Sequence, residues 1–189
     1  LTIDAAGDGL SSAVYEATDG TLTRVRANDD IDSVGKLWAQ IPTVFGFKGA
    51  RHAGKFMGMA AYVKEVPDDL REEFRELIKV DGTDIVNHHQ RRHVDSDYET
   101  IVHDLKDRLG DYGAPKVARA LQDRTEEVLT EFARAAVDRV GRSRIALAGG
   151  VVANVKLNQR IYELPEVEKI FVHQNMGDGG LGLGAALNV

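Results

Sequence analysis

Two aspartates near the start of the chain lie among small residues. Asp4 and Asp8 belong to residues 2–12, TIDAAGDGLSS, between two runs typical of strands. A carboxylate beside bound phosphates can act through a magnesium ion, orient water, or accept a proton from an attacking hydroxyl. Gly7 and Gly9 leave room for a nucleotide to approach the backbone. The alternative is that both aspartates only cap turns, as aspartates often do.

A pair of glycines separates an apolar run from a helix-compatible segment. Residues 145–158 have the sequence IALAGGVVANVKLN, which contains Gly149, Gly150 and Asn154. A strand that delivers a tight glycine loop to a helix N-terminus is a common way to hold a nucleotide or a phosphate. The glycine amides can reach an anionic group, and the Asn154 amide can bond a ribose or a base. The other interpretation is a simple strand-to-helix turn with Asn154 as a polar residue of the first turn.

Two further segments carry residues suited to a nucleotide. Residues 54–62, GKFMGMAAY, offer Lys55 as a cation for phosphate and Met57 as a soft apolar contact for a purine. The alternative there is a surface lysine and core methionines. Residues 175–186, NMGDGGLGLGAA, form a second glycine-rich loop, in which Gly177 precedes Asp178. The alternative for Asp178 is an N-cap of the last helix.

The elements that must position these residues begin as strands and then alternate with helices. The expected strands are 1–5, 11–18, 21–27, 144–148 and 169–172, and the expected helices are 32–45, 67–77, 114–140, a segment after 152 and a final glycine-rich segment. Asp19 and Gly20 are expected to form a hairpin turn. The sequence therefore predicts an α/β fold in which a mixed sheet is flanked by helices.

Between about residues 80 and 97 the periodicity fails, and histidines and arginines gather. We expect an inserted, solvated basic loop here. His89 and His93 have the HxxxH spacing that puts two imidazoles on one face of a helix, a pattern seen in metal sites. The neighbouring Arg91 and Arg92 disfavour a cation. We therefore expect these histidines not to be metal ligands.

Composition bounds the class of protein. The chain has 189 residues, of which 43% are hydrophobic and 29% charged, as suits one compact domain. A formal net charge of -6 argues against a nucleic-acid partner, because such proteins normally present a basic face. The absence of cysteine excludes disulfides and thiolate sites. Since no long apolar run and no signal peptide are visible, we expect a cytoplasmic protein without a membrane partner.

Four segments together resemble one known family. IDAAGDG at 3–9, GKFMGMAAY at 54–62, LAGGVVANVKLN at 147–158 and MGDGGLGLGAA at 176–186 resemble the NodU/CmcH carbamoyltransferases, which are nodulation-factor and antibiotic O-carbamoylases. The segments occur in the family order, and this order makes the resemblance specific, because single glycine-rich loops are common. The resemblance implies the N-terminal domain of these enzymes. That domain is an actin-like ATPase domain whose two RNase H-like halves close on a nucleotide, and it is related to the enzymes that form threonylcarbamoyl-tRNA.

The resemblance also implies roles for the candidate residues. Asp178 would be a carboxylate ligand of a divalent metal, iron or magnesium, completed by two histidines from a preceding half. Asp8 would be a general base or a phosphate-loop residue, with Asp4 as the second candidate. The glycine pair with Asn154 would meet the adenosine or a phosphate, and the helix with Lys55 would lie near the nucleotide.

The position of the first motif suggests which part of the domain this is. In the family the histidine pair precedes a loop like IDAAGDG, and here the chain begins at that loop. We therefore expect residues 1–189 to be the second RNase H-like half. The first half and a carboxyl-terminal domain would belong to a longer protein, and the isolated fragment would be inactive.

The activity that the resemblance implies is ATP-dependent O-carbamoyl transfer. The donor would be carbamoyl phosphate, the intermediate carbamoyladenylate, and the acceptor a hydroxyl group of a small molecule. One rival is a sugar-kinase-like phosphotransferase on the same fold, which would release ADP. A second rival is a nucleotide-gated interaction module of the actin or heat-shock ATPase kind. The combined order of the motifs favours the transferase, and the sequence does not identify the acceptor.

Overall fold

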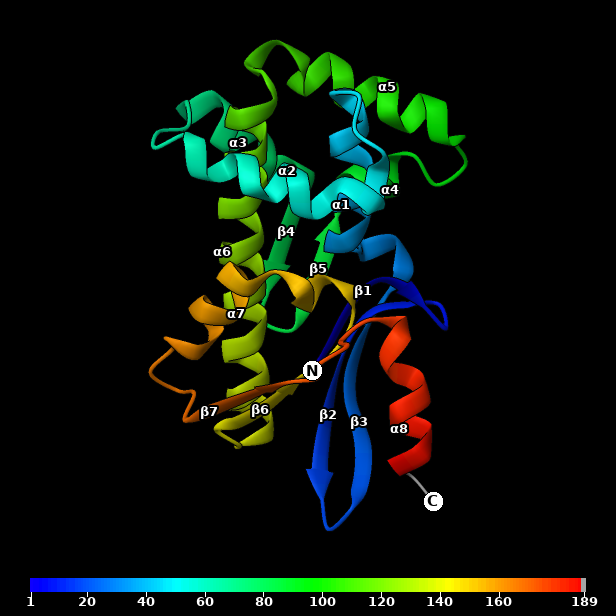
Figure 1. Ribbon diagram of the computed structural model, residues 1–189, viewed down its shortest axis with the longest axis vertical. Coiled ribbons are helices and arrows are strands. Elements are labelled where there is room, and N and C mark those ends of the chain that lie inside the picture. The colour runs from blue at the N-terminus through cyan, green and yellow to red at the C-terminus, as the bar shows by residue number, and fades with distance from the viewer. Residues whose placement is uncertain (188–189) are drawn as a thin grey trace.

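The computed structural model describes residues 1–187, which open with a three-stranded antiparallel meander (Figure 1). Its strands are β1 (Thr2–Gly7), β2 (Leu10–Thr18) and β3 (Thr21–Asp29). Two Asp-Gly pairs make the turns: Asp8 and Asp19 adopt φ values of 52° and 50°, and the glycine after each is also left-handed. Positive φ at both turn residues matches the twist of a tight hairpin. The turn expected at Asp19 is confirmed.

Two later strands extend the meander. β6 (Arg144–Leu147) and β7 (Lys169–Val172) pair in parallel, as expected for these segments. The Ile3 amide donates to the Ala148 carbonyl at 2.8 Å, and the Ala148 amide donates to the Leu1 carbonyl at 3.0 Å. These bonds place β6 beside β1, so the strands follow the order β3-β2-β1-β6-β7. The expected mixed α/β fold is confirmed.

Helices cover the sheet and extend beyond one end of it (Figure 1). The α-helices are α1 (Val34–Val44), α2 (Ala53–Met59), α3 (Asp68–Leu77), α4 (His88–Arg92), α5 (Tyr98–Leu109), α6 (Ala114–Val140), α7 (Val155–Tyr162) and α8 (Leu181–Leu187). The 3-10 turns are η1 (Asp30–Asp32), η2 (Gly49–His52), η3 (Ala60–Tyr62), η4 (Gly110–Tyr112), η5 (Gly150–Ala153) and η6 (Asp178–Gly180). Within residues 1–187, none of these helices combines the length and the apolar character needed to cross a bilayer.

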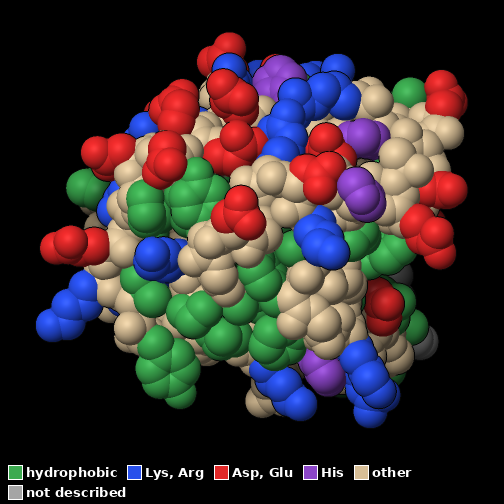
Figure 2. Space-filling model, turned by 90° about the horizontal axis from the view of Figure 1, so that it is seen from above, with side chains coloured by type: hydrophobic (Ala, Val, Ile, Leu, Met, Phe, Trp, Pro, Cys, Tyr) green, Lys and Arg blue, Asp and Glu red, His purple; other side chains and the backbone are tan. Residues whose placement is uncertain are grey.

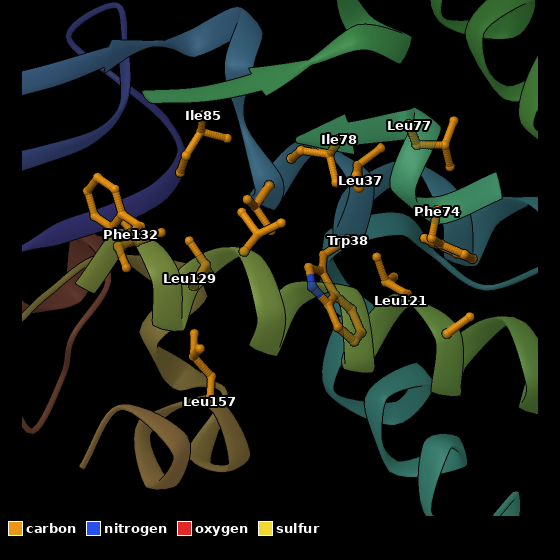
Figure 3. Packing of buried hydrophobic residues seen from close by; sticks show 14 of the residues in the cluster. Leu37, Trp38, Phe74, Leu77, Ile78, Ile85, Leu121, Leu129, Phe132 and Leu157 are labelled. Atoms are coloured by element: carbon orange, nitrogen blue, oxygen red, sulfur yellow. The ribbon is translucent and has the colours of Figure 1, made fainter. Parts of the chain in front are cut away.

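The core forms around α6 (Figure 3), which runs along most of the long axis of the molecule (Figure 1). Leu121, Leu129 and Phe132 lie on the apolar stripe expected for this helix, and each is at most 1% exposed. Trp38 of α1 and Leu157 of α7 pack around the same helix. Proline in the first turn and a left-handed glycine at the end delimit α6, as both residues commonly do.

The prediction of a loop at residues 80–97 is wrong. β4 (Ile78–Asp81) and β5 (Asp84–Asn87) form an antiparallel hairpin, and α4 follows it directly. Asn28 anchors the hairpin, because its side chain donates to the Thr83 carbonyl and accepts from the Ile85 amide, each at 3.0 Å. These partners are 55 and 57 positions away from Asn28. Strands this short show too little alternation to be recognised without such distant contacts.

Candidate functional site

A pocket of about 250 Å³ lies where four separate segments of the chain meet. Its walls come from β1, from α1, from the η2–α2 segment and from η5 with the residue after it. The lining residues are Asp4, Ala5, Gly35, Trp38, Ala39, Ala50, Ala53, Gly54, Met57, Gly150, Val151, Ala153 and Asn154. Most of them are glycine or alanine, so a ligand can approach the backbone closely. A mainly apolar concavity with a few polar groups is typical of a small-molecule site.

Asp4 joins two walls of this pocket through its carboxylate. One oxygen, Oδ1, accepts from the Ala5 amide at 2.6 Å, and the other, Oδ2, accepts from the Gly150 amide at 3.0 Å. The carbonyl of Asp4 accepts from the Ser33 hydroxyl at 3.0 Å, and the same hydroxyl caps α1 by accepting from the Lys36 amide. Asp4 therefore fixes β1 relative to both α1 and η5.

The glycine pair is a point of very close approach between η5 and β1. Gly149 adopts a φ of 105°, and a Cβ at this position would lie 2.6 Å from the carbonyl carbon of Ile3. Its amide donates to the Met176 carbonyl at 2.6 Å, and the Gly150 amide donates to Asp4. The amides that we expected to meet an anionic ligand therefore have partners within the chain. The pair serves first to bring η5 against β1.

Asn154 lines the pocket, but its side chain is already engaged. Its Oδ1 accepts from the Leu157 amide at 3.1 Å, which makes it the N-cap of α7. The side-chain amides of Asn154 and Gln122 also donate to each other, at 2.8 and 3.2 Å. This arrangement corresponds to the turn-residue interpretation. Through Gln122, α6 fixes the start of α7 beside the pocket.

A cationic segment borders the pocket at η2 and α2. Met57 contributes to the lining, whereas Lys55 is exposed and is not among the lining residues. Lys48 and Arg51 precede Lys55 in the same stretch of chain. Desolvation, followed by the charges of Lys55 and Lys48, lowers the pKa of His52. Lys48, Arg51 and Lys55 together give this stretch a local excess of positive charge, which suits an anionic ligand.

The first glycine-rich loop contributes only Asp4 and Ala5 to the pocket lining. Gly7 pairs with Leu10, and Asp8 with Gly9 forms the exposed tip of the β1–β2 hairpin. This geometry corresponds to the turn-forming alternative. Of the two aspartates that the sequence singled out, Asp4 is the one that lines the pocket.

Asp178 lies close to the wall formed by Gly150. A Cβ on the preceding residue, Gly177, would come within 3.9 Å of the Gly150 Cα atom. Gly177 rather than Asp178 occupies the N-cap position of η6, and the Asp178 side chain is exposed. The residue directly before Asp178 thus approaches the pocket wall at Gly150.

Comparison with known proteins places the chain in a family. A family model described as the carbamoyltransferase N-terminus matches residues 1–187. The chain belongs to this carbamoyltransferase family. The match includes all four segments that carried the resemblance, which is therefore confirmed.

Several relatives of this carbamoyltransferase domain are longer proteins. The nodulation protein NolNO of Sinorhizobium fredii is 30% identical over 99% of this chain and 27% of its own length. The nodulation protein NolO of Bradyrhizobium diazoefficiens is 28% identical over 100% of this chain and 34% of its own length. The uncharacterised protein MJ1051 of Methanocaldococcus jannaschii is 30% identical over 99% of this chain and 36% of its own length. The chain thus spans about a third of the length of these curated relatives.

The pocket of this carbamoyltransferase-family chain also includes residues that the sequence patterns did not single out. Gly35 and Trp38 of α1 and Ala50 of η2 belong to its lining. A Cβ on Gly35 would lie 2.7 Å from the Ala5 Cα atom, so α1 approaches β1 as closely as two backbones can. The sequence feature that could have indicated this contact is Gly35 itself, in the first turn of a helix. Glycine is less favourable there than alanine, so its presence often indicates a packing constraint.

Proposed function

We propose that this chain forms one wall of the nucleotide site of an ATP-dependent O-carbamoyltransferase. The observation that carries the proposal is convergence: Asp4, Gly54 and Gly150 come from three of the four family-like segments, and all line one pocket. The overall reaction would consume carbamoyl phosphate, ATP and one water molecule, pass through carbamoyladenylate, and place the carbamoyl group on an acceptor hydroxyl. Phosphate, pyrophosphate and AMP would be the other products.

The pocket suits the adenosine part of the nucleotide. Its small side chains admit a flat ring, and Trp38 and Met57 offer apolar contact. Complete ligand sites usually measure about 300–1,000 Å³, so a volume of about 250 Å³ fits one side of a nucleotide. The opposite side would come from the further polypeptide that the longer relatives contain. Lys48, Arg51 and Lys55 would favour the phosphates electrostatically.

The strand order supports the actin-like architecture as part of this proposal. Three antiparallel strands followed by two parallel ones, in the order β3-β2-β1-β6-β7, is the arrangement expected of an RNase H-like half. A second half would close over the pocket from the open side. Asp4, at β1 in the centre of this order, would then face the cleft between the halves.

Asp178 is the residue that we propose to hold a divalent metal. Its exposed carboxylate, next to the contact between Gly177 and Gly150, suits a cation shared with ligands elsewhere in the polypeptide. When bound, the metal would polarise the carbamoyl carbonyl. Asp4 would keep the pocket wall in register with this metal through its bond to Gly150. The base function of Asp8 stays a prediction, because its turn lies outside the pocket lining.

Product analysis of the intact longer protein tests the reaction. The protein is given ATP, carbamoyl phosphate, a divalent metal and a panel of hydroxylated acceptors. AMP and pyrophosphate that form only with carbamoyl phosphate, together with a carbamoylated acceptor, would support the proposal. ADP with a phosphorylated acceptor would mean a kinase, and nucleotide binding without transfer would mean an interaction module.

A pair of glycine variants tests the pocket itself. Gly54 and Gly58 lie on α2, and a Cβ on either meets no atom within 4 Å, but only Gly54 lines the pocket. In the intact longer protein, we expect Gly54→Leu to raise the KM for ATP about tenfold, equivalent to ~1.4 kcal/mol of binding free energy. The leucine side chain would occupy the volume in which the nucleotide binds. Gly58→Leu is the matched control and should leave the KM within about twofold. Equal KM values for the two variants would contradict the location of the site.

A further inference from the structure

Two histidines and an aspartate form a cluster between α4 and α5. His89, His93 and Asp104 each offer one ligand atom, and these atoms lie within 4.8 Å of one another. His89 Nδ1 is 3.2 Å from Asp104 Oδ2, and His93 Nε2 is 3.5 Å from the same oxygen. The molecular end that carries α3 and α5 shows histidines among acidic and basic side chains (Figure 2). The expectation that His89 lies in a solvated loop is wrong, since this residue is fully buried.

His89 is the best indication of a ligand in this cluster. Its relative exposure is 0%, and neither ring nitrogen has a hydrogen-bond partner among the described residues. Oδ2 of Asp104 is likewise buried without a hydrogen bond, because its approach to His89 lacks the required geometry. Buried polar atoms are nearly always satisfied. Burial lowers the pKa of His89 to about 4, with partial opposition from Asp104. The two ring nitrogens without partners are the geometric indication that a ligand belongs here.

The other members of the cluster have outer partners that fix their orientation. His93 Nδ1 lies 3.2 Å from the Ser96 hydroxyl, and this contact leaves Nε2 to face Asp104. Arg108 Nε lies 3.2 Å from Oδ2 of Asp104 on the same helix. Metal-binding histidines and carboxylates usually have such neighbours, which hold the ligand atoms in place.

Nearby arginines do not prevent a cation from binding. Arg91 makes two bonds of 2.7 Å to Asp32, and Arg108 forms an ion pair with Glu73. The charge of Arg91 is therefore balanced outside the cluster, whereas the charge of Arg108 is shared between Glu73 and Asp104. Arg92 is exposed, where solvent screens its charge.

We propose that His89, His93 and Asp104 bind a divalent transition-metal ion, for which zinc is the best match. Zinc takes imidazole nitrogen and carboxylate oxygen at about 2.0–2.2 Å, so the ligand atoms of a tetrahedral site lie about 3.3 Å apart. The separations of 3.2 and 3.5 Å in this cluster are close to that value. A water molecule would complete the site from the side where His93 and Asp104 are partly exposed.

The ion would have a structural role, because it would tie α4 to α5. The helix α4 has five residues, which is too short to be stable alone. The three ligands come from α4, its C-cap residue and α5, and not from the loop that carries Asp178, so this site has different donors from the metal proposed at Asp178. A metal held in this way adds its binding free energy to folding.

The test measures zinc in the intact longer protein that carries Asp178→Ala, so that the other proposed metal does not contribute. His93→Ala and Asp104→Asn are compared in this background, because both residues are partly exposed and removing buried His89 could unfold the chain. His103→Ala is the matched control, since His103 is exposed, lies on α5 as Asp104 does, and pairs with Asp107. Circular dichroism verifies that each variant is folded.

We expect one equivalent of zinc in the background protein and in the His103→Ala control, and none in His93→Ala or Asp104→Asn. A chelator should lower the Tm of the background protein and leave the Tm of His93→Ala unchanged. Cobalt in place of zinc should give visible absorption bands that disappear in His93→Ala. Equal zinc content in His93→Ala and in the control, or a background protein that takes up no zinc when it is supplied, would overturn the proposal.

Discussion

Gly149 is the residue on which the junction between β1 and η5 depends most. It combines a φ of 105° with a backbone contact to Ile3 that leaves no room for a Cβ. We expect Gly149→Ala to lower the free energy of unfolding by about 3 kcal/mol or more, because the strand and the turn must separate. Denaturant unfolding measures this change.

Gly141 provides the control for that prediction. It has a φ of 71° at the end of α6, and a Cβ there meets nothing within 4 Å. Gly141→Ala should therefore cost only the backbone strain, about 1 kcal/mol. If the two variants lost the same stability, close approach to Ile3 would not be the reason for glycine at position 149.

Among the elements, the β4–β5 hairpin and α4 are held to the rest of the fold by a buried carboxylate in addition to Asn28. Asp32 is 4% exposed, and its Oδ1 accepts from the Asn87 amide at 3.0 Å. Its two oxygens also accept from Arg91, each at 2.7 Å. One side chain in η1 thus connects the end of β5 with α4.

We expect Asp32→Ala to lower the free energy of unfolding by about 2 kcal/mol, because the Asn87 amide would remain buried without an acceptor. Asp84→Ala is the control. Asp84 lies on the β4–β5 hairpin and pairs with Arg26 of β3, but both side chains are about half exposed. Such a pair contributes at most about 1 kcal/mol. Thermal and urea unfolding give the free energy of unfolding of both variants. A larger loss for Asp84→Ala than for Asp32→Ala would contradict the role of Asp32 in holding the hairpin.

The contrast between long and short elements explains how much of the fold was predictable. The helix α6 repeats its apolar stripe over 27 residues, and β2 and β3 are joined by an Asp-Gly turn, so local patterns were sufficient. The strands of the β4–β5 hairpin have four residues each and depend on Asn28 and Asp32, which are distant in sequence. No local pattern can report contacts of that kind.

The candidate site was predictable as a set of segments but not as a set of atoms. The motifs indicated that β1, α2 and η5 meet, and Asp4, Met57 and Gly150 do line one pocket. The partners of the polar groups were not visible, because Asn154 bonds Gln122, which is 32 positions away. The HxxxH spacing of His89 and His93 was visible in the sequence, but only the fold brings Asp104 close to the two histidines.

For the whole molecule, the apolar surface of α8 is the feature that the described chain leaves uncovered. Leu181, Leu183 and Leu187 are 71%, 50% and 75% exposed, and none of the residues of α8 is buried. Exposed apolar groups gathered in this way usually mark an interaction surface. The helix projects beside β3, directly after the loop with Asp178 (Figure 1). We therefore expect further polypeptide, of the kind that the longer relatives contain, to cover α8 next to the proposed metal.

The double variant Leu181→Ser and Leu183→Ser tests this expectation in two settings. In the intact protein it should lower the Tm by about 5 °C or more, because buried leucines lose their packing. In the chain of 189 residues alone it should leave the Tm unchanged and reduce self-association, which light scattering measures. Tyr62→Ser is the control, since Tyr62 is 82% exposed on a different segment and should be neutral in both settings. An intact protein that kept its Tm in the double variant would mean that α8 faces solvent, and the cleft would then have to close without it.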